Sequence, residues 1–356
     1  MADIRIDAGA LRACMERIFE KEGFAPEDAR AIADVLMQAD LFGIESHGAQ
    51  RLMYYHRNIQ SGSVDVSAKP EVLRETPVSA LIDGHFGMGA LVAQFAMRKA
   101  IEKAKQAGVG IVAVRNSTHF GIAGYYTLMA EREGLASFSM TNTGPIMVPT
   151  FGREMMLGTN PLAFCMPADP VPFWFDASTT VVTLGKVEVY HKRGKPMPEG
   201  WTIDGDGAPC TDAASRNEAI LAGERGGILP LGGAGEVFGG HKGYGLAIMV
   251  EALTGVLAQG MTSQQMCGAH GDHTCHFFLA FDPAMFGDPA DIRARMSAYL
   301  RALRESERIP GCARIFTPGE KAFEAQARRL REGVPVEENT LAEVRQIARE
   351  LHVEGI

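Results

Sequence analysis

The sequence predicts a mixed α/β protein that does not use the Rossmann fold, and three observations carry that prediction. Apolar residues recur at helical spacing near both ends of the 356-residue chain, whereas short strand-like runs separated by glycine and proline fill its middle. The glycine cluster at 84–89 does not fit the G-x-G-x-x-G pattern with a later acidic residue. The expected architecture is therefore a helical domain built from both chain ends and a separate α/β domain.

The helical domain is expected to be discontinuous, with residues 1–75 and 287–356 contributing to it. Apolar side chains lie at helical spacing over 8–20, and the pattern repeats over 26–43 after Pro26, which predicts a helical hairpin. Two amphipathic helices are expected at 289–305 and 337–351.

The α/β domain is expected over residues 76–286. Strands are predicted at 80–82, 111–114, 136–141, 162–166, 173–175 and 277–281, and helices at 88–106 and 243–257. The stretch 194–212 is rich in Gly, Pro and Asp and is expected to be a surface excursion.

Composition and charge exclude several classes of function. The 35 Lys and Arg against 43 Asp and Glu give a net charge of −8, and no segment concentrates basic residues as a nucleic-acid interface would. The first residues lack the pattern of a signal peptide. The longest apolar stretch, 246–257, contains Glu251 and is shorter than the about 20 residues that span a bilayer. We therefore expect a cytoplasmic protein without nucleic-acid or membrane partners.

The six cysteines have no regular spacing, which favours reduced thiols over a disulfide framework. Cys14 and Cys165 lie among apolar neighbours and are expected to be small core residues.

The first candidate site is the segment 45–52, which contains Ser46, His47 and Arg51. If this segment is helical, His47 and Arg51 are four residues apart and project from one face, so a proton donor adjoins a group that binds carboxylates. That pairing suits 2-oxo acids. The alternative is a histidine and an arginine on a solvated helix face.

The second candidate is His119, in a polar turn that follows a predicted strand and opens a helix. Open α/β sheets bind ligands in such turns, and the small residues there permit close approach of the backbone. A structural histidine bonded to a backbone carbonyl is the alternative.

Asp176 is the third candidate, because it ends the apolar run 173–175. A buried carboxylate needs a partner, and an Asp–His pair is the simplest interpretation. The alternative is a helix N-cap or turn aspartate.

The fourth candidate is the glycine-rich segment 239–245, at the start of the predicted apolar helix. Glycines, free N–H groups at a helix N-terminus and Lys242 suit a pyrophosphate, whereas a solvated turn is the alternative. The segment 267–276 holds cysteines and histidines, yet their spacing matches no zinc knuckle, so no metal site is expected.

Eight motifs occur in order along residues 8–325. They are Ser46-His47-Gly48 with Arg51, Asn116-Ser117-Thr118-His119-Phe120-Gly121, Gly158-Thr159-Asn160-Pro161-Leu162, Gly194-Lys195 with Pro198-Glu199-Gly200-Trp201, Leu229-Pro230-Leu231-Gly232, Gly240-His241-Lys242-Gly243-Tyr244-Gly245, His276-Phe277-Phe278 and Pro318-Gly319-Glu320. Together they closely resemble the malate/L-lactate dehydrogenase family. That family also includes ureidoglycolate, sulfolactate and diketogulonate enzymes and cyclic imino-acid reductases.

The resemblance implies a homodimer whose α/β domain binds NAD or NADP as hydride carrier and a small 2-oxo or 2-hydroxy acid as substrate. By similarity, Ser46, His47 and Asp176 form a polar relay, Arg51 and Thr159 contact the substrate carboxylate, and His119 is a second site histidine. Reduction of the carbonyl also requires a proton donor, and His47 and His119 both remain candidates for it.

The resemblance also implies cofactor contacts in four segments. They fall at His119, Phe120, Gly121, Ile122, Ala123 and Gly124, at Asp176 and Ser178, at His241 and Lys242, and at Pro318, Gly319 and Glu320. One departure concerns 176–180, where many members have Asp-Met-Ala-Thr-Ser and this chain has Asp-Ala-Ser-Thr-Thr. The choice between NAD and NADP therefore stays open.

Three other functions compete with a 2-hydroxy acid dehydrogenase. A cyclic 2-imino-acid reductase uses the same hydride chemistry with protonation at nitrogen. A zinc hydrolase would use the cluster at 270–276, and a non-catalytic binding module has no need for two histidines, an arginine and a phosphate site.

Overall fold

A seven-stranded mixed sheet forms the centre of the protein. The structure is a computed structural model that describes residues 4–267 and 273–356. In spatial order, the strands are β2 (Glu71–Glu75), β3 (Ser79–Asp83), β4 (Val109–Ser117), β11 (Thr274–Phe281), β5 (Ala136–Thr141), β6 (Leu162–Met166) and β7 (Phe173–Ala177). Among the described strands of this sheet, only β3 and β4 pair in parallel. The mixed, largely antiparallel sheet confirms the predicted class and differs from a doubly wound parallel sheet.

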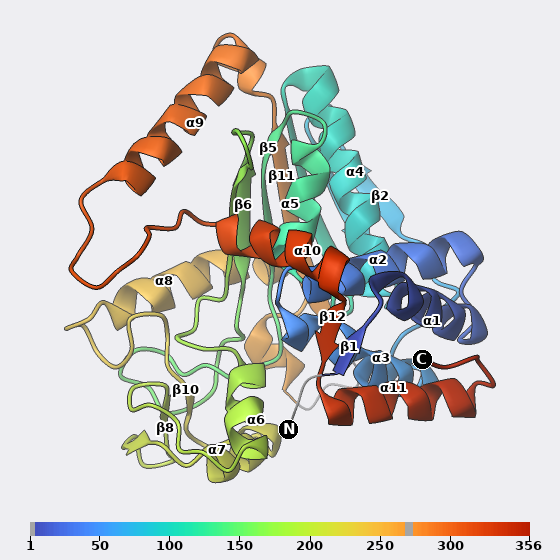
Figure 1. Cartoon of the computed structure of the whole chain (residues 1–356), viewed down its shortest axis with the longest axis vertical. Helices are drawn as coiled ribbons and strands as arrows, with labels where there is room; N and C mark the ends of the chain where they lie inside the picture. Colours follow the sequence, from blue (N-terminus) through green and yellow to red (C-terminus); the bar gives the residue numbers. More distant parts are fainter. Residues whose placement is uncertain (1–3, 268–272) are drawn as a thin grey trace.

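The two faces of the sheet carry different helices, as expected from the alternation of side chains along each strand. On β11, Phe278 and Ala280 belong to the main core, where α4 (Gly89–Ala107) and α5 (Ala123–Glu131) pack. Phe277 and Leu279 instead pack with Val250 of α8 (Gly240–Glu251). Figure 1 shows α4 and α5 lying along the strands.

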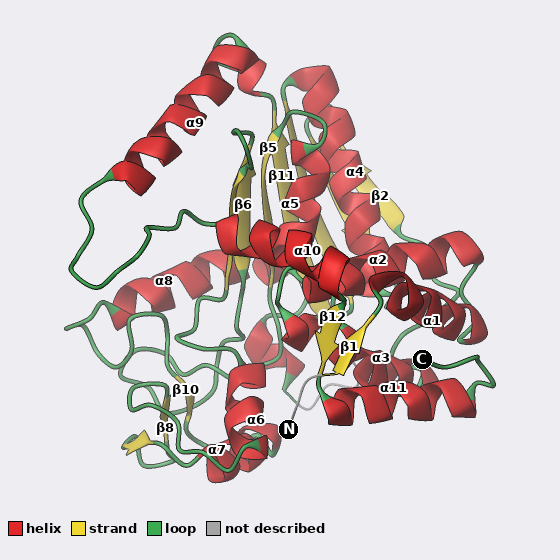
Figure 2. Ribbon diagram, in the orientation of Figure 1, coloured by secondary structure: helices red, strands yellow, loops and turns green. Residues whose placement is uncertain are grey.

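Helices from both chain ends pack together beside the sheet. They are α1 (Ala8–Lys21), α2 (Pro26–Leu41), α3 (Leu52–Gln60), α10 (Glu320–Glu332) and α11 (Glu338–Glu350). The end segments also pair directly, because β1 (Ile4–Ile6) forms an antiparallel pair with β12 (Val334–Val336). Figure 2 shows these helices gathered around the short β1–β12 pair. The exact domain boundaries at residues 75 and 287 stay a prediction.

A smaller region follows β7 in the chain. It contains α6 (Leu184–Lys192), α7 (Ala213–Leu221) and a three-stranded sheet of β10 (Gly227–Ile228), β8 (Thr202–Ile203) and β9 (Pro209–Cys210). The surface excursion predicted at 194–212 is therefore wrong in part. Met197 packs in a small core with α6 and α7, and Thr202 and Ile203 are buried as well.

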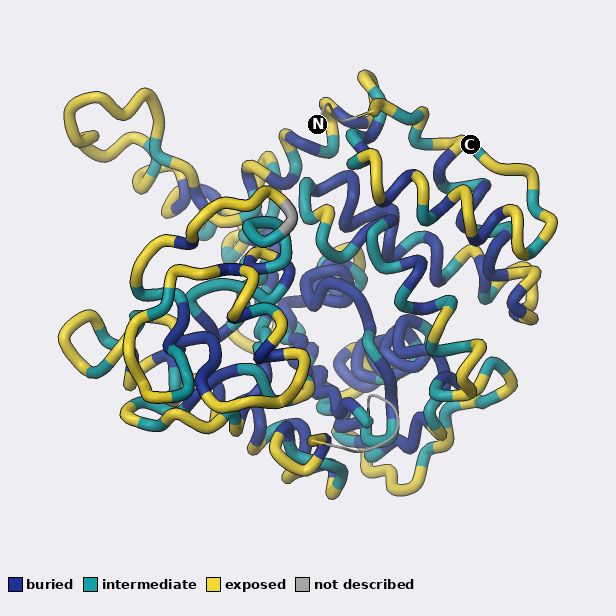
Figure 3. Tube along the Cα trace, turned by 90° about the horizontal axis from the view of Figure 1, so that it is seen from below, coloured by how far each residue is buried: buried dark blue, intermediate teal, exposed yellow. Residues whose placement is uncertain are grey.

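Most other predicted elements are confirmed within a few residues, and β5, β6 and α9 (Pro289–Glu305) match their predicted bounds. The apolar helix expected over 243–257 differs, because α8 ends at Glu251 and a π-helical turn (Ala252–Val256) follows. Cys14 and Cys165 are fully buried, as expected. Figure 3 shows buried chain concentrated in the interior, with exposed loops around it. No helix in the described part of the chain is long and apolar enough to cross a bilayer.

Candidate active site

Two short 3₁₀ turns, rather than one continuous helix, carry Ser46, His47 and Arg51. The turns Glu45–His47 and Ala49–Arg51 are separated at Gly48 and lead into α3. A Cβ atom at Gly48 would lie 1.9 Å from Oδ1 of the buried Asp40, so a side chain does not fit there. Asp40 also accepts the N–H of Ala49 at 2.8 Å, and burial raises the pKa of its carboxyl to about 7. The helical face expected for His47 and Arg51 is therefore replaced by a turn that packs on Asp40.

Arg51 and His47 nevertheless lie together. The Nε of Arg51 donates to the carbonyl oxygen of Ser46 at 2.7 Å, and the Ser46 hydroxyl lies 2.9 Å from Nδ1 of His47. Burial, followed by the charge of Arg51, lowers the pKa of His47 to about 3. His47 is therefore a neutral imidazole beside a guanidinium at ordinary pH.

The ring of His119 stacks on the ring of His47. Their ring centroids are 5.5 Å apart with an interplanar angle of 27°, and the rings of Tyr54 and His119 form a T-shaped contact with centroids 5.9 Å apart. Nδ1 of His119 lies 2.7 Å from the Tyr55 hydroxyl and accepts a longer bond from the Gly121 N–H at 3.4 Å. Because Nδ1 accepts, the ring proton of the neutral form belongs on Nε2.

The pKa of His119 is also lowered, first by burial and then by electrostatic interaction with His47 and with the charge of Arg51. The site thus contains two stacked, neutral imidazoles. The sequence analysis missed Tyr54 and Tyr55, although their position one turn after Arg51 on α3 could have indicated them.

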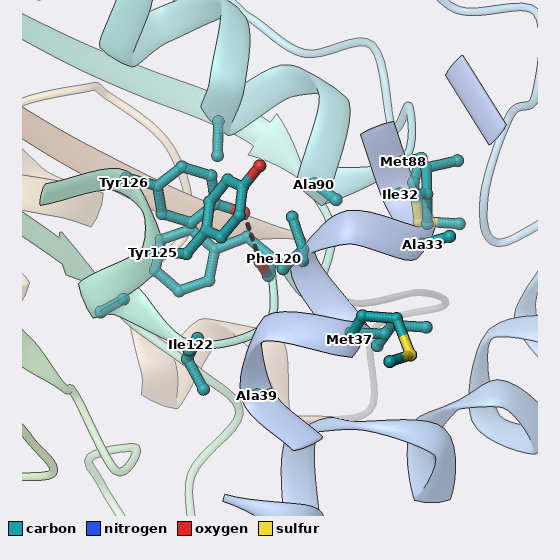
Figure 4. Close-up of a cluster of buried hydrophobic side chains, with 14 of the residues drawn as sticks. Ile32, Ala33, Met37, Ala39, Met88, Ala90, Phe120, Ile122, Tyr125 and Tyr126 are labelled. Carbon is teal, nitrogen blue, oxygen red and sulfur yellow. Dashed lines mark hydrogen bonds between the residues drawn. The ribbon is translucent and has the colours of Figure 1, made fainter. Parts of the chain in front are cut away.

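The loop after His119 packs into the main hydrophobic core. Figure 4 shows Phe120 and Ile122 packed with side chains of α2 and α5, with the Tyr126 hydroxyl donating to the Phe120 carbonyl. Phe120 stacks on the buried His276 with ring centroids 4.6 Å apart. Phe120, Ile122 and Ala123 are buried, and their expected cofactor contacts stay a prediction.

His276 is a supporting residue that the sequence analysis did not select for the site. Its Nδ1 lies 2.8 Å from the Thr141 hydroxyl and its Nε2 lies 2.7 Å from the Ser117 hydroxyl. Burial lowers its pKa to about 3, so it acts as a neutral hydrogen-bonding group. His276 on β11 thereby links β4 and β5 through its two ring nitrogens, and its ring contacts Phe120 of the loop that follows His119.

Asp176 lies on β7, and its carboxylate accepts a hydrogen bond from a backbone N–H group. Its Oδ2 accepts the N–H of Gly124 at 2.8 Å, and burial raises its pKa to about 6 against that hydrogen bond. A Cβ atom at Gly124 would lie 2.2 Å from the ring of Trp174, which makes glycine necessary at the start of α5. Within the described residues, no hydrogen bond joins Asp176 to His47 or His119. The polar relay through Asp176 stays a prediction.

Thr159 lies in a loop fixed by neighbouring threonines. Its N–H donates to the Thr143 hydroxyl at 3.0 Å, and its carbonyl accepts the N–H of Thr179 at 2.9 Å. Nearby, the Ser178 hydroxyl donates to the carbonyl of Thr180 at 3.3 Å. The chain then enters α6, where a Cβ atom at Gly185 would lie 3.3 Å from Cβ of Ser46 and 3.8 Å from Nη2 of Arg51. The start of α6 therefore packs against the Ser46–Arg51 turn.

The other two expected cofactor segments differ in exposure. His241 and Lys242 are exposed in the first turn of α8, whose N-cap Gly239 provides no side-chain cap. Gly319 packs on Trp174 with a positive φ of 96°, whereas the buried Glu320 pairs with Arg304 at 2.6 Å and Arg314 at 3.0 Å. The hydrogen bond from Arg304 lowers the pKa of Glu320 against the effect of burial. The Glu320 carboxylate is thus engaged by two arginines.

Part of the segment 267–276 lies outside the described residues, which exclude 268–272. Among the residues that are described, no group of three His, Cys, Asp or Glu side chains could hold a metal ion.

Comparison with known proteins gives the family. Residues 6–345 match the family described as malate/L-lactate dehydrogenase. The chain is 43% identical to a malate dehydrogenase of Pyrococcus abyssi, over 99% of this chain and 96% of that protein. It is also 33% identical to a Δ1-pyrroline-2-carboxylate reductase of Burkholderia ambifaria, over 94% and 95% of the two chains.

A solved structure of malate dehydrogenase from Entamoeba histolytica has the same fold. It superposes with a TM-score of 0.95 at 35% identity and covers 99% of each chain. The order of the motifs, the mixed sheet and these matches agree, and the chain therefore belongs to the malate/L-lactate dehydrogenase family.

Proposed function

We propose that the protein is an NAD- or NADP-dependent dehydrogenase that interconverts a small 2-oxo acid and the corresponding 2-hydroxy acid, of the malate, lactate or sulfolactate type. The observation that carries the proposal is the stacked His47–His119 pair beside Arg51. Such a substrate has a carboxylate next to its reacting carbon, so a cation and a proton carrier must lie side by side.

The neutral state of both histidines fits the oxidation direction directly. A neutral imidazole accepts the hydroxyl proton of a 2-hydroxy acid, and His47 and His119 are both candidates for this acceptor. When bound, the nicotinamide accepts the hydride in this direction and supplies it in the other.

Reduction needs a protonated histidine, and the charge of Arg51 opposes protonation in the free protein. A substrate carboxylate on Arg51 offsets that charge, which raises the proton affinity of the neighbouring imidazole. Arg51 thereby serves two purposes, because it binds the substrate and links its binding to proton uptake. Ser46 holds Nδ1 of His47 in position for either direction.

The dinucleotide has a suitable cradle at the start of α8. Gly239 gives the helix an N-terminus without a side-chain cap, and the exposed His241 and Lys242 side chains can reach a phosphate there. These features fit a pyrophosphate-containing cofactor and do not select between NAD and NADP.

We also propose a cytoplasmic homodimer. Leu246, Ile248 and Met249 expose apolar surface on α8, as a subunit interface requires. The six free cysteines suit a reducing compartment.

A panel of substrates with both cofactors tests the proposal. Purified protein is given pyruvate, oxaloacetate, sulfopyruvate or a cyclic 2-imino acid with NADH or NADPH, and absorbance of the reduced cofactor is followed. Oxidation of the cofactor by at least one 2-oxo acid is expected. The similarity to a pyrroline-carboxylate reductase favours a cyclic 2-imino-acid reductase as the second candidate. Activity with the imine alone would establish that candidate and refute the 2-oxo acid assignment.

A further inference from the structure

Glu251 is a buried carboxylate that the mechanism above does not use. It is the last residue of α8, it interrupts the longest apolar stretch of the sequence, and it is 6% exposed. Within the described part of the chain, no Lys, Arg or His forms an ion pair with it. A buried charge without a counter-ion is costly unless hydrogen bonds satisfy it, so the donors around Glu251 indicate its role.

Three buried polar residues donate to the Glu251 carboxylate. Nδ2 of Asn160 donates to Oε1 at 3.0 Å, and Nδ2 of Asn142 donates to Oε2 at 3.2 Å. The Ser263 hydroxyl also donates to Oε1, and the Ser263 N–H donates to the same atom at 3.2 Å. All three donor residues are fully buried. The carboxylate is therefore the acceptor at the centre of a closed polar network.

Other hydrogen bonds fix the orientation of the two amides. Oδ1 of Asn142 accepts the N–H of Cys275 at 2.8 Å, and Nδ2 of Asn160 also donates to the carbonyl of Ala247 at 3.2 Å. Both NH₂ groups are thereby directed at Glu251 and require an acceptor there. A glutamine at position 251 would place its own NH₂ group against at least one of these donors.

The network fixes the loop that carries Thr159. Asn160 follows Thr159 and has a positive φ of 38°, and its side chain is bonded to both Glu251 and the α8 backbone. The residue before Thr159 is Gly158, whose N–H donates to the Ser263 hydroxyl at 3.0 Å. Both chain neighbours of Thr159 are therefore connected to Glu251, whereas Thr159 itself is partly exposed.

We propose that Glu251 is a positioning residue, which fixes the loop 158–160 on the end of α8 so that the Thr159 hydroxyl contacts the carboxylate of the 2-oxo acid. The inference rests on the proposed function, in which the same carboxylate lies on Arg51. A hydroxyl stabilises a carboxylate only at hydrogen-bond distance, so a small displacement of the loop removes the contact. The π-helical turn that begins after Glu251 agrees with this role, because such turns are frequent at functional sites.

The first test is the variant Glu251→Gln in the full-length protein, assayed with saturating dinucleotide and each accepted 2-oxo acid. This variant keeps the size of the side chain and leaves a buried donor without an acceptor, so KM should rise by about fivefold or more. The value of kcat should change by less than about twofold, because Thr159 binds the carboxylate in the ground state and in the transition state alike.

A double-mutant cycle separates positioning of Thr159 from a general loss of structure. Thr159→Val removes the hydroxyl and should itself raise KM. In that background, Glu251→Gln should change KM by less than about twofold, because the contact that Glu251 positions is already absent. Ser263→Ala is a smaller change that removes the bond to Gly158, and it should show the same non-additivity with Thr159→Val.

Glu22→Gln is the matched control. Glu22 is another buried carboxylate, at the C-cap of α1, and it accepts hydrogen bonds from His56 and Gln60 of α3. Its effect on KM should add to that of Thr159→Val, because the two residues share no partner. Dinucleotide affinity, measured by fluorescence titration, should stay near that of wild type in every variant and reports that each is folded.

Additive effects of Glu251→Gln and Thr159→Val would overturn the positioning role, and so would an unchanged KM in either single variant. A wild type that reduces none of the 2-oxo acids with either cofactor would instead refute the proposed function, so the two failures are distinguishable.

Discussion

The histidine pair and the start of α8 are built in opposite ways. His47 and His119 are partly buried, stacked on each other and held through their Nδ1 atoms by Ser46 and Tyr55. His241 and Lys242 are exposed on a helix terminus without a side-chain cap. The difference indicates distinct tasks, since proton transfer depends on fixed, desolvated groups and attraction of an anion does not. Changes at the first region should therefore affect the chemical step, and changes at the second should affect binding.

The largest effect is expected from removal of the proton carrier. His47→Ala or His119→Ala, whichever removes the true carrier, should lower kcat by about 10² or more, because general acid–base catalysis contributes that much. Dinucleotide affinity, measured by fluorescence titration, should survive. Near-normal rates in both single variants would show that neither histidine carries the proton.

A smaller but still large effect is expected at Arg51. Arg51→Lys keeps the charge but loses the two-bond fork, so it should cost about 2–4 kcal/mol in kcat/KM for every accepted 2-oxo acid. Dinucleotide binding should be unchanged. A variant that binds the dinucleotide less well, yet reduces substrate normally at saturation, would place Arg51 on the cofactor side.

The smallest effect is expected at the exposed region. Lys242→Ala should weaken dinucleotide binding by about 0.3–1 kcal/mol at low salt, and the loss should shrink as salt rises. Titrations of wild type and variant at two salt concentrations measure it. Equal affinities at low salt would remove Lys242 from the cofactor site and leave the two regions without the proposed division of tasks.

The sequence predicted regular elements well where local pattern decides the structure. Strand β5 and helix α9 match their predicted bounds, because β5 is bounded by glycine and proline segments and α9 begins at a Pro with Asp288 as its N-cap. Local pattern also produced the prediction of a surface excursion at 194–212, a stretch rich in Gly, Pro and Asp, and that prediction is wrong in part. Its short strands depend on Met197 and Ile203 packing against distant residues, which no local pattern reveals.

Motifs in the sequence selected the candidate site residues, but they did not predict how these residues are arranged. The break at Gly48 follows from its contact with Asp40, and the position of His119 follows from Tyr55, 64 residues away in the sequence. Asp176 likewise accepts a hydrogen bond from the backbone N–H of Gly124, 52 residues away in the sequence, and its expected pairing with a histidine stays a prediction. Such contacts depend on tertiary packing and lie beyond periodicity or spacing.

The pH dependence of 2-hydroxy acid oxidation tests the central claim most directly. Folded-state pKa values of about 3 for His47 and well below 6.5 for His119 keep both bases neutral, so kcat/KM should not fall through the ordinary histidine range. An unperturbed histidine base would lose about thirtyfold between about pH 8 and about pH 5. Asp176 and Asp40, which packs on the Gly48 turn, titrate near pKa values of about 6 and about 7, so any bend that either carboxyl causes should disappear in Asp176→Asn or Asp40→Asn. A profile that is flat once both carboxyls are replaced is the predicted result, and a bend near pH 6.5 that persists in the double variant would contradict a neutral histidine base.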